Sequence, residues 1–155
     1  HLVAEMGDKA PRLLIVGKRG WRCDQIVQAI ADPKLRSFVI EANGLSTAAY
    51  RVLLGHALAL LSPSTNEGYG LPLAEALASG VPAVASDIPS HREQGRGAVL
   101  YLPPDRPEDW RHAVTAVAAP ESRLRADLLA RARLHVSVKQ PDYEGALSAF
   151  LNEIT

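Results

Sequence analysis

The chain has 155 residues, of which 47% are hydrophobic and 22% are charged. This composition is typical of a globular protein, and the length allows one compact domain with its own hydrophobic core. Lysine plus arginine and aspartate plus glutamate are balanced at 17 each, so no overall positive field attracts nucleic acid. The single cysteine excludes an intrachain disulfide and a zinc site made of cysteines, and no apolar run approaches the ~20 residues of a membrane-spanning helix.

The first segment, His1–Met6, has the pattern of the last turns of a helix that ends at Gly7. Because a helix would then open the domain, we expect the first strand of the domain to be absent from this chain. Short apolar runs follow, and runs that are apolar at successive positions predict strands covered on both faces. These runs are Arg12–Gly17, Ser37–Glu41, Ala57–Ser62, Pro82–Ser86 and Ala98–Leu102.

Helical periodicity separates the runs. Residues 23–30 carry apolar side chains at helical spacing, and Ser46 has the side chain of an N-cap for a helix that includes Leu54. The segment Leu71–Ser79 predicts a third helix, which Gly80 ends. This alternation of strands and helices predicts an α/β fold with a doubly wound, Rossmann-like parallel sheet and helices on both faces.

A stiff, proline-rich connector, Leu102–Pro107, follows the last strand. We expect helices after it, the first with Trp110 in the core, and the last with an amphipathic stripe over Tyr143–Ile154. We therefore divide the chain into an α/β domain over residues 1–118 and a C-terminal helical tail over residues 119–155 that packs on it.

Polar residues gather at the predicted carboxyl ends of the strands, where ligands bind in open parallel sheets. These ends are Gly17–Gly20, Glu41–Gly44, Ser62–Gly70 and the pair Ser86 and Asp87. The third is the richest in glycine, since Gly68 and Gly70 let the backbone approach a ligand closely. The free N–H groups from Gly70 onward, with the positive end of the helix dipole, predict an anion site suited to a diphosphate.

Two carboxylates flank this predicted anion site. Glu67 lies in the loop before the helix, and Glu75 lies inside the helix, ~6 Å along its axis from Leu71. Each carboxylate can accept hydrogen bonds from the two hydroxyls of a diol. A single glutamate is usually an ordinary surface residue, but this pair around a glycine-rich helix start indicates a ligand with a diphosphate between a sugar and a ribose, which describes a nucleotide sugar.

The run PSTNEGYGLPLAEALASGVPAVASD, from Pro63 to Asp87, resembles the segment with two glutamates separated by seven residues in retaining GT-B glycosyltransferases. It is most similar to the glycosyltransferase group 1 (GT4) family. Two flanking segments, Leu14–Trp21 and Asp87–Glu93, resemble that family's donor-binding domain as well, so the resemblance covers roughly residues 1–118.

The resemblance implies a role for each residue of this segment. Glu67, the candidate catalytic residue, would contact the hydroxyls of the transferred sugar without acting as a nucleophile. Glu75 would bind the ribose diol, and the N–H of Leu71 would hold the diphosphate. The residues implied to bind the donor are Lys18, Asn43, Gly44, Gly68, Tyr69, Gly70, Leu71 and Glu75.

The resemblance further implies the donor-binding, C-terminal half of a retaining enzyme of polysaccharide biosynthesis, which transfers a hexose from a nucleotide diphosphate to a glycan or lipid. No cofactor or metal is expected. The implied partner is an acceptor-binding N-terminal domain, without which we expect this chain to be inactive. The location implied is cytoplasmic, and contact with the inner face of the membrane and self-association through an exposed face stay open.

Other interpretations stay open beside this one. The chain could be a non-catalytic nucleotide-sugar-binding module that works with a partner chain. A flavodoxin-like or receiver-like domain would need a flavin-binding loop or an acidic pocket, and an epimerase of related fold would not need the glutamate spacing. For His91 a structural or surface role is favoured over one lining the cleft, and the arginines of residues 123–133 are interpreted as a solvated helix face.

Overall fold

The structure, a computed structural model, describes residues 2–20 and 23–137. The predicted stripe over Tyr143–Ile154 and the residue Trp21 lie outside the described residues.

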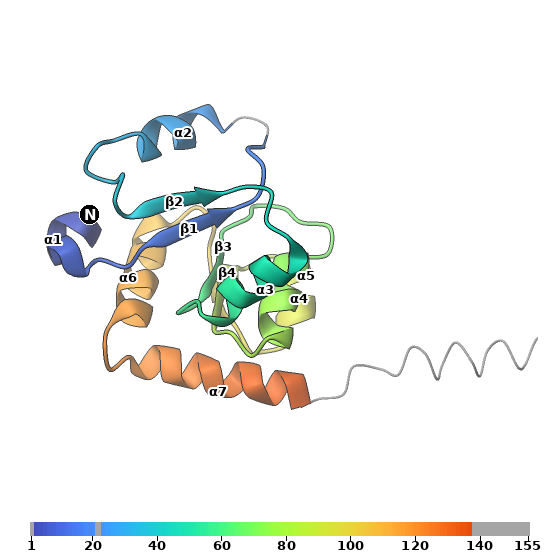
Figure 1. Ribbon diagram of the computed structural model, residues 1–155. Helices are drawn as coiled ribbons and strands as arrows, with labels where there is room; N and C mark the ends of the chain where they lie inside the picture. The colour runs from blue at the N-terminus through green and yellow to red at the C-terminus, as the bar shows by residue number, and fades with distance from the viewer. Residues whose placement is uncertain (1, 21–22, 138–155) are drawn as a thin grey trace, which may run out of the picture.

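All five apolar runs overlap a strand, and every pair of neighbouring strands is parallel (Figure 1). The predicted α/β class is therefore confirmed. The strands form two sheets, however, in place of one continuous sheet: β1 pairs only with β2, and the second sheet has the order β3-β4-β5. The strands are β1 (Leu13–Val16), β2 (Val39–Ala42), β3 (Leu60–Ser62), β4 (Ala83–Ser86) and β5 (Leu100–Leu102).

Helices connect the strands and complete the chain. The short α1 (Leu2–Met6) and the 3-10 turn η1 (Gly7–Lys9) precede β1, as the helical pattern of the first segment predicts. In Figure 1, β1 and β2 lie on one side of the molecule with α1 and α2, and α7 runs along the opposite side. The remaining helices are α2 (Asp24–Ile30), α3 (Thr47–Gly55), α4 (Leu71–Ala78), α5 (Pro89–Gly95), α6 (Pro107–Ala118) and α7 (Arg123–Ser137).

The two sheets differ in how well they are covered. Every residue of β4 is buried, as predicted for a strand with helices on both faces. The prediction of two covered faces is wrong for the β1–β2 sheet, where Leu13 is 43% and Ile40 is 45% exposed. Its residues take part in none of the three buried apolar clusters of the described chain, because those clusters form between β3–β5 and helices α3, α4, α6 and α7.

The core of the molecule lies on the two faces of the β3–β5 sheet. Ala83 and Ala85 of β4 face Leu73 and Leu77 of α4, and the small alanine side chains let this helix lie close to the sheet. Their neighbour Val84 faces the opposite side and packs against α6. Helix α7 contributes Ala132 to the cluster on the α4 side and Leu128 to the cluster on the α6 side. The predicted core position of Trp110 is confirmed.

Two predicted helix ends are confirmed in detail. The Ser46 hydroxyl accepts a hydrogen bond from the N–H of Ala49 at 3.2 Å and so caps α3. Gly80 follows α4 with a φ of +66°, and its N–H donates to the carbonyl of Leu77 at 2.9 Å. A left-handed residue at this position is the common end of a helix, and glycine adopts it without strain.

Candidate functional site

The loop between β3 and α4 ends in an exposed helix N-terminus. Gly70 is the N-cap of α4, with φ +77° and ψ +44°, and no side chain of the described residues caps the helix there. Leu71 is 62% and Tyr69 is 58% exposed, so the first N–H groups of α4 lie beside open surface. Such a helix start favours an anion, through its N–H groups and the helix dipole together.

Glu67 is held in position by a neighbour in the same loop. The Ser64 hydroxyl donates a hydrogen bond to Oε1 of Glu67 at 2.7 Å, and the pair is partly buried. Because this bond occupies one oxygen, the other is left to accept a hydrogen bond from a ligand hydroxyl. The sequence analysis did not single out Ser64, although its spacing of three residues from Glu67 is a signal of such a local bond.

Glu75 lies on the exposed face of α4 and contacts Tyr50 of α3. Burial raises the pKa of the Tyr50 phenol above its usual 10, and the charge of Glu75 and a hydrogen bond to its carboxylate raise it further. A protonated phenol is a donor, so Tyr50 lies where it can interact with the carboxylate of Glu75. Tyr50 is a site residue that sequence reasoning missed, because its position on a helical stripe indicated packing only.

The second group of predicted residues follows the strands of the other sheet. Lys18 lies after β1, and Asn43 and Gly44 lie after β2, next to one another because Val16 and Ala42 are register partners at the strand ends. Gly44 has a φ of +69°. In Figure 1 the connection from β2 to α3 is on the same side of the molecule as the β3–α4 loop.

An ion pair crosses the carboxyl ends of β1 and β2. Arg19 donates to both oxygens of Glu41, with Nε 3.1 Å from Oε1 and Nη2 2.8 Å from Oε2. This hydrogen-bonded guanidinium lowers the pKa of the Glu41 carboxyl. The pair fixes the turn that contains Lys18 while leaving the Lys18 side chain exposed. The structure therefore brings Lys18, Asn43 and Gly44 together at one sheet and residues 67–75 together at the other.

A further ion pair lies at the carboxyl end of β4. Arg92 of α5 donates to both oxygens of Asp87, including Nη2 to Oδ2 at 2.8 Å, and its guanidinium lies 4.8 Å from the ring centroid of Tyr101. The bond to Arg92 lowers the pKa of the Asp87 carboxyl. The negative charge of Asp87 at this strand end is thus neutralised by the positive charge of Arg92.

His91 is fully buried, which excludes direct contact between its side chain and a ligand in the cleft. Its Nδ1 lies 2.9 Å from the carbonyl oxygen of Ser86, and its Nε2 lies 3.4 Å from the Ser62 hydroxyl. Of the structural and surface roles favoured from the sequence, the structural one is therefore correct, because the side chain is buried.

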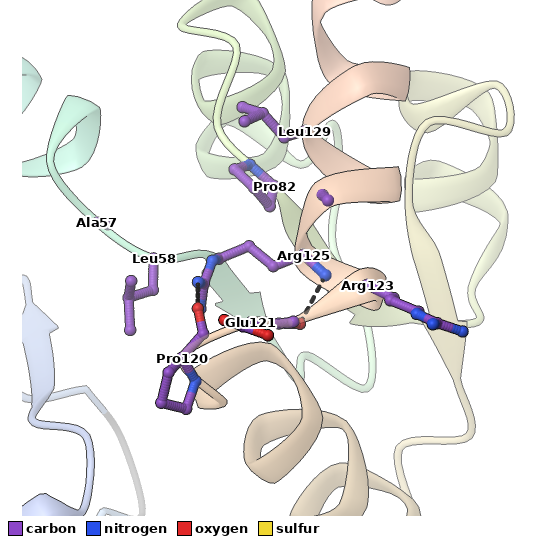
Figure 2. Close-up of a pocket in the computed structure, with 10 residues that line it drawn as sticks. Ala57, Leu58, Pro82, Pro120, Glu121, Arg123, Arg125 and Leu129 are labelled. Atoms are coloured by element: carbon purple, nitrogen blue, oxygen red, sulfur yellow. Dashed lines mark hydrogen bonds between the residues drawn. The ribbon is translucent and has the colours of Figure 1, made fainter.

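A hollow of about 560 Å³ lies at the opposite, amino edge of the β3–β5 sheet (Figure 2). Leu58 and Pro82 form part of its wall, and Arg125 of α7 crosses it. The guanidinium of Arg125 donates to the carbonyl oxygens of Val117, Ala119 and Pro120 at the end of α6, so both of its terminal nitrogens take part in hydrogen bonds. Arg123, which also lines the hollow, is exposed. The interpretation of residues 123–133 as a solvated arginine face is wrong for Arg125.

The sequence profile of the family described as glycosyl transferases group 1 matches residues 1–119. The chain belongs to this family. Among curated relatives, this group 1 chain is 34% identical over 102 residues to the O-antigen chain mannosyltransferase RfbU of Salmonella typhimurium. The match covers 66% of the chain and 29% of that protein. It is 32% identical over 103 residues to the serotype-specific mannosyltransferase WbdA of Escherichia coli, covering 66% of the chain and 13% of that protein.

Solved structures share the fold of this group 1 chain. A variant of TarM from S. aureus, in complex with fondaparinux, alpha-GlcNAc-glycerol and UDP, has a TM-score of 0.75 and 23% identity, and the match covers 97% of the chain and 30% of TarM. WaaG, described as a glycosyltransferase involved in lipopolysaccharide biosynthesis, has a TM-score of 0.67 and 22% identity over 84% of the chain and 35% of WaaG. The chain spans about a third or less of the length of these proteins. Among the described residues no helix is long and apolar enough to cross a membrane.

Proposed function

We propose that this group 1 domain binds the nucleotide-diphosphate sugar of a retaining glycosyltransferase. The observation that carries the proposal is the arrangement at the start of α4, where Glu67 and Glu75 flank exposed backbone N–H groups that no side chain caps among the described residues. A diphosphate fits the helix N-terminus, a sugar diol fits Glu67, and a ribose diol fits Glu75. UDP in the TarM complex supports a nucleotide diphosphate as the ligand of this fold.

In the proposed reaction the bond between the anomeric carbon and the diphosphate oxygen breaks, and its electron pair leaves with the nucleotide. The acceptor oxygen forms the new bond to the anomeric carbon on the same face, and its proton passes to the departing phosphate. The N–H groups of α4 stabilise the negative charge that grows on the leaving group. Glu67 orients the sugar through its hydroxyls, and the step as proposed needs no metal.

Mannose is the sugar that we propose is transferred, because two curated relatives are named mannosyltransferases. The acceptor is proposed to be a growing glycan or a lipid-linked glycan, as the O-antigen name of one of these relatives indicates. A partner domain that binds this acceptor would face the exposed residues Tyr69 and Leu71 and exclude water from the reacting carbon. Lys18, Asn43 and Gly44 are proposed to contact the nucleoside.

Ligand-observed NMR of the 155-residue chain with UDP, GDP and ADP, each free and as a sugar conjugate, tests the proposal. We expect saturation transfer from the protein to one nucleotide, and we expect Glu75→Ala to abolish it, since a diol then loses both of its acceptors. Glu121→Ala is the matched control, because Glu121 is an exposed glutamate at the amino edge of the sheet. Equal transfer in the wild type and Glu75→Ala would refute the assignment of the ribose site.

A further inference from the structure

His91 is the only ionisable side chain that is buried among residues 2–20 and 23–137. It belongs to α5, which begins directly after the carboxyl end of β4, and it lies between this strand end and α4. Burying an imidazole without hydrogen bonds is costly, so a buried histidine indicates specific partners. Both ring nitrogens of His91 have one.

The partners of the ring determine its tautomer. A carbonyl oxygen only accepts hydrogen bonds, so Nδ1, 2.9 Å from the oxygen of Ser86, carries the hydrogen. Nε2 then accepts a hydrogen bond from the Ser62 hydroxyl, which lies 3.4 Å away. Ser86 completes the arrangement, because its own hydroxyl donates to the carbonyl of Ser62 at 3.3 Å. The imidazole is thus tied to the carboxyl ends of both β3 and β4.

The other side of the ring meets the start of α4. A Cβ atom at Gly70 would lie 3.2 Å from Cδ2 of His91, so the α-carbon of Gly70 rests directly against the imidazole edge. Gly70 is itself buried and left-handed, and it is the N-cap of α4. The position of the imidazole ring at the strand ends therefore determines the position of Gly70. The position of Gly70 in turn determines the direction of the Leu71 N–H.

The backbone of His91 is fixed as well. The Tyr101 hydroxyl of β5 donates to the carbonyl oxygen of His91 at 3.2 Å. Tyr101 reaches this oxygen by passing over Gly95, where a Cβ atom would lie 2.1 Å from the phenol oxygen. The residue is thus held by β3, β4 and β5 together, which makes it a rigid spacer under the loop of residues 63–70.

From this geometry we propose that His91 is a positioning residue for the donor-binding loop. Its imidazole supports Gly70 from below and so holds the N–H groups at the start of α4 in the arrangement that a diphosphate requires. The side chain never touches the ligand. The expected effect of His91 on donor binding rests on the proposed function. The expected effect of His91 on the positions of Gly70 and Leu71 does not depend on it.

Backbone amide NMR of the chain tests the proposal without any ligand. His91→Phe keeps a ring of similar size and removes both hydrogen bonds, so we expect the amide signals of Gly70 and Leu71 to move. His56→Phe is the matched control, because the exposed His56 also has its Nδ1 on a carbonyl oxygen, that of Val52 at 2.8 Å, but lies at the far end of α3. We expect that variant to leave both signals in place, and we expect a hydrogen on Nδ1 of His91 in the nitrogen spectrum of the wild type.

Nucleotide binding supplies the second measurement. With the nucleotide that binds the wild type, we expect His91→Phe to weaken affinity about tenfold, the loss of one hydrogen bond to a charged group, and His56→Phe to leave it unchanged. If His91→Phe does not fold, Ser62→Ala takes its place, since it removes only the donor to Nε2 and should move the same two amide signals. Unmoved Gly70 and Leu71 signals in a folded variant would overturn the proposal. A wild type that binds no nucleotide would refute the proposed function while the amide shifts still decide the role of His91.

Discussion

Alanine at Gly70 should destabilise the chain more than alanine at Gly80, although both glycines flank the same helix and both are left-handed. Their φ values are +77° and +66°. An alanine in this conformation costs roughly 1–2 kcal/mol, and its lower entropy in the unfolded chain returns about 0.4–1 kcal/mol. The backbone contribution is therefore about 1 kcal/mol at each position.

The surroundings of the two glycines separate them. At Gly80 the nearest atom to an added Cβ is Cγ of Arg133 at 3.9 Å, an ordinary contact. At Gly70 it is Cδ2 of His91 at 3.2 Å, and this ring is tied to two strand ends and cannot turn away. Forcing a methyl group into such a place costs roughly 1–3 kcal/mol. We expect about 1 kcal/mol for Gly80→Ala and about 2–4 kcal/mol for Gly70→Ala.

Equilibrium urea unfolding followed by circular dichroism measures both values in the same chain. The difference between the variants isolates the contact with His91, since the backbone cost is shared. Equal losses of stability, within about 0.5 kcal/mol, would show that the imidazole yields, and the reasoning about a rigid support under Gly70 would then be wrong.

Two further predictions concern the amino edge of the sheet and the tyrosines. Arg125→Ala should lower the free energy of unfolding by about 1–3 kcal/mol, because carbonyl oxygens at the end of α6 lose a charged donor. The control Arg123→Ala, at an exposed position, should change it by less than about 0.5 kcal/mol. Equal effects of the two substitutions in urea unfolding would contradict the role of Arg125. Burial raises the pKa of Tyr50 and Tyr101 above the usual 10 in the folded chain, so the unfolded chain loses these protons first and stability, fully present below pH 10, should fall as pH rises above it. The double variant Tyr50→Phe/Tyr101→Phe should flatten this fall in unfolding experiments across that range, and an unchanged slope would contradict the assignment.

The sequence was sufficient to locate the strands but not to predict their coverage. The runs that became β1 and β4 are both short and apolar, and both were expected to be buried on two faces. Burial depends on the elements that pack against a strand, and for β4 these are α4 and α6, which lie on either side of it. No comparable pair covers β1 in the described chain, so three of its four residues are exposed although all four are large and apolar.

The candidate site likewise combines features of one contiguous segment, which can be predicted from the sequence, with contacts between residues far apart in the chain, which cannot. The glycine-rich loop, the helix start and the two glutamates are contiguous in the chain, so their spacing was enough to predict them. The contacts of His91 with Ser62 and Gly70 join residues far apart in the chain, and only the order β3-β4-β5 brings them together. A lone histidine in a sequence carries no sign of such a network, because its partners are hydroxyl, carbonyl and glycine groups found in every protein.

Helix α4 joins the core and the site in one element. Leu73 and Leu77 are fully buried against the sheet, whereas Leu71 and Glu75 are exposed on the same short helix. Because the buried face is fixed by packing and Gly70 rests on His91, the N–H groups at the helix start are already ordered before a ligand binds. Binding there then costs little conformational entropy, which favours affinity from few contacts. The turn that carries Lys18 is instead held by the exposed Arg19–Glu41 pair, so among the described residues the more deeply supported part of the proposed donor site is the part that would hold the diphosphate and the sugar.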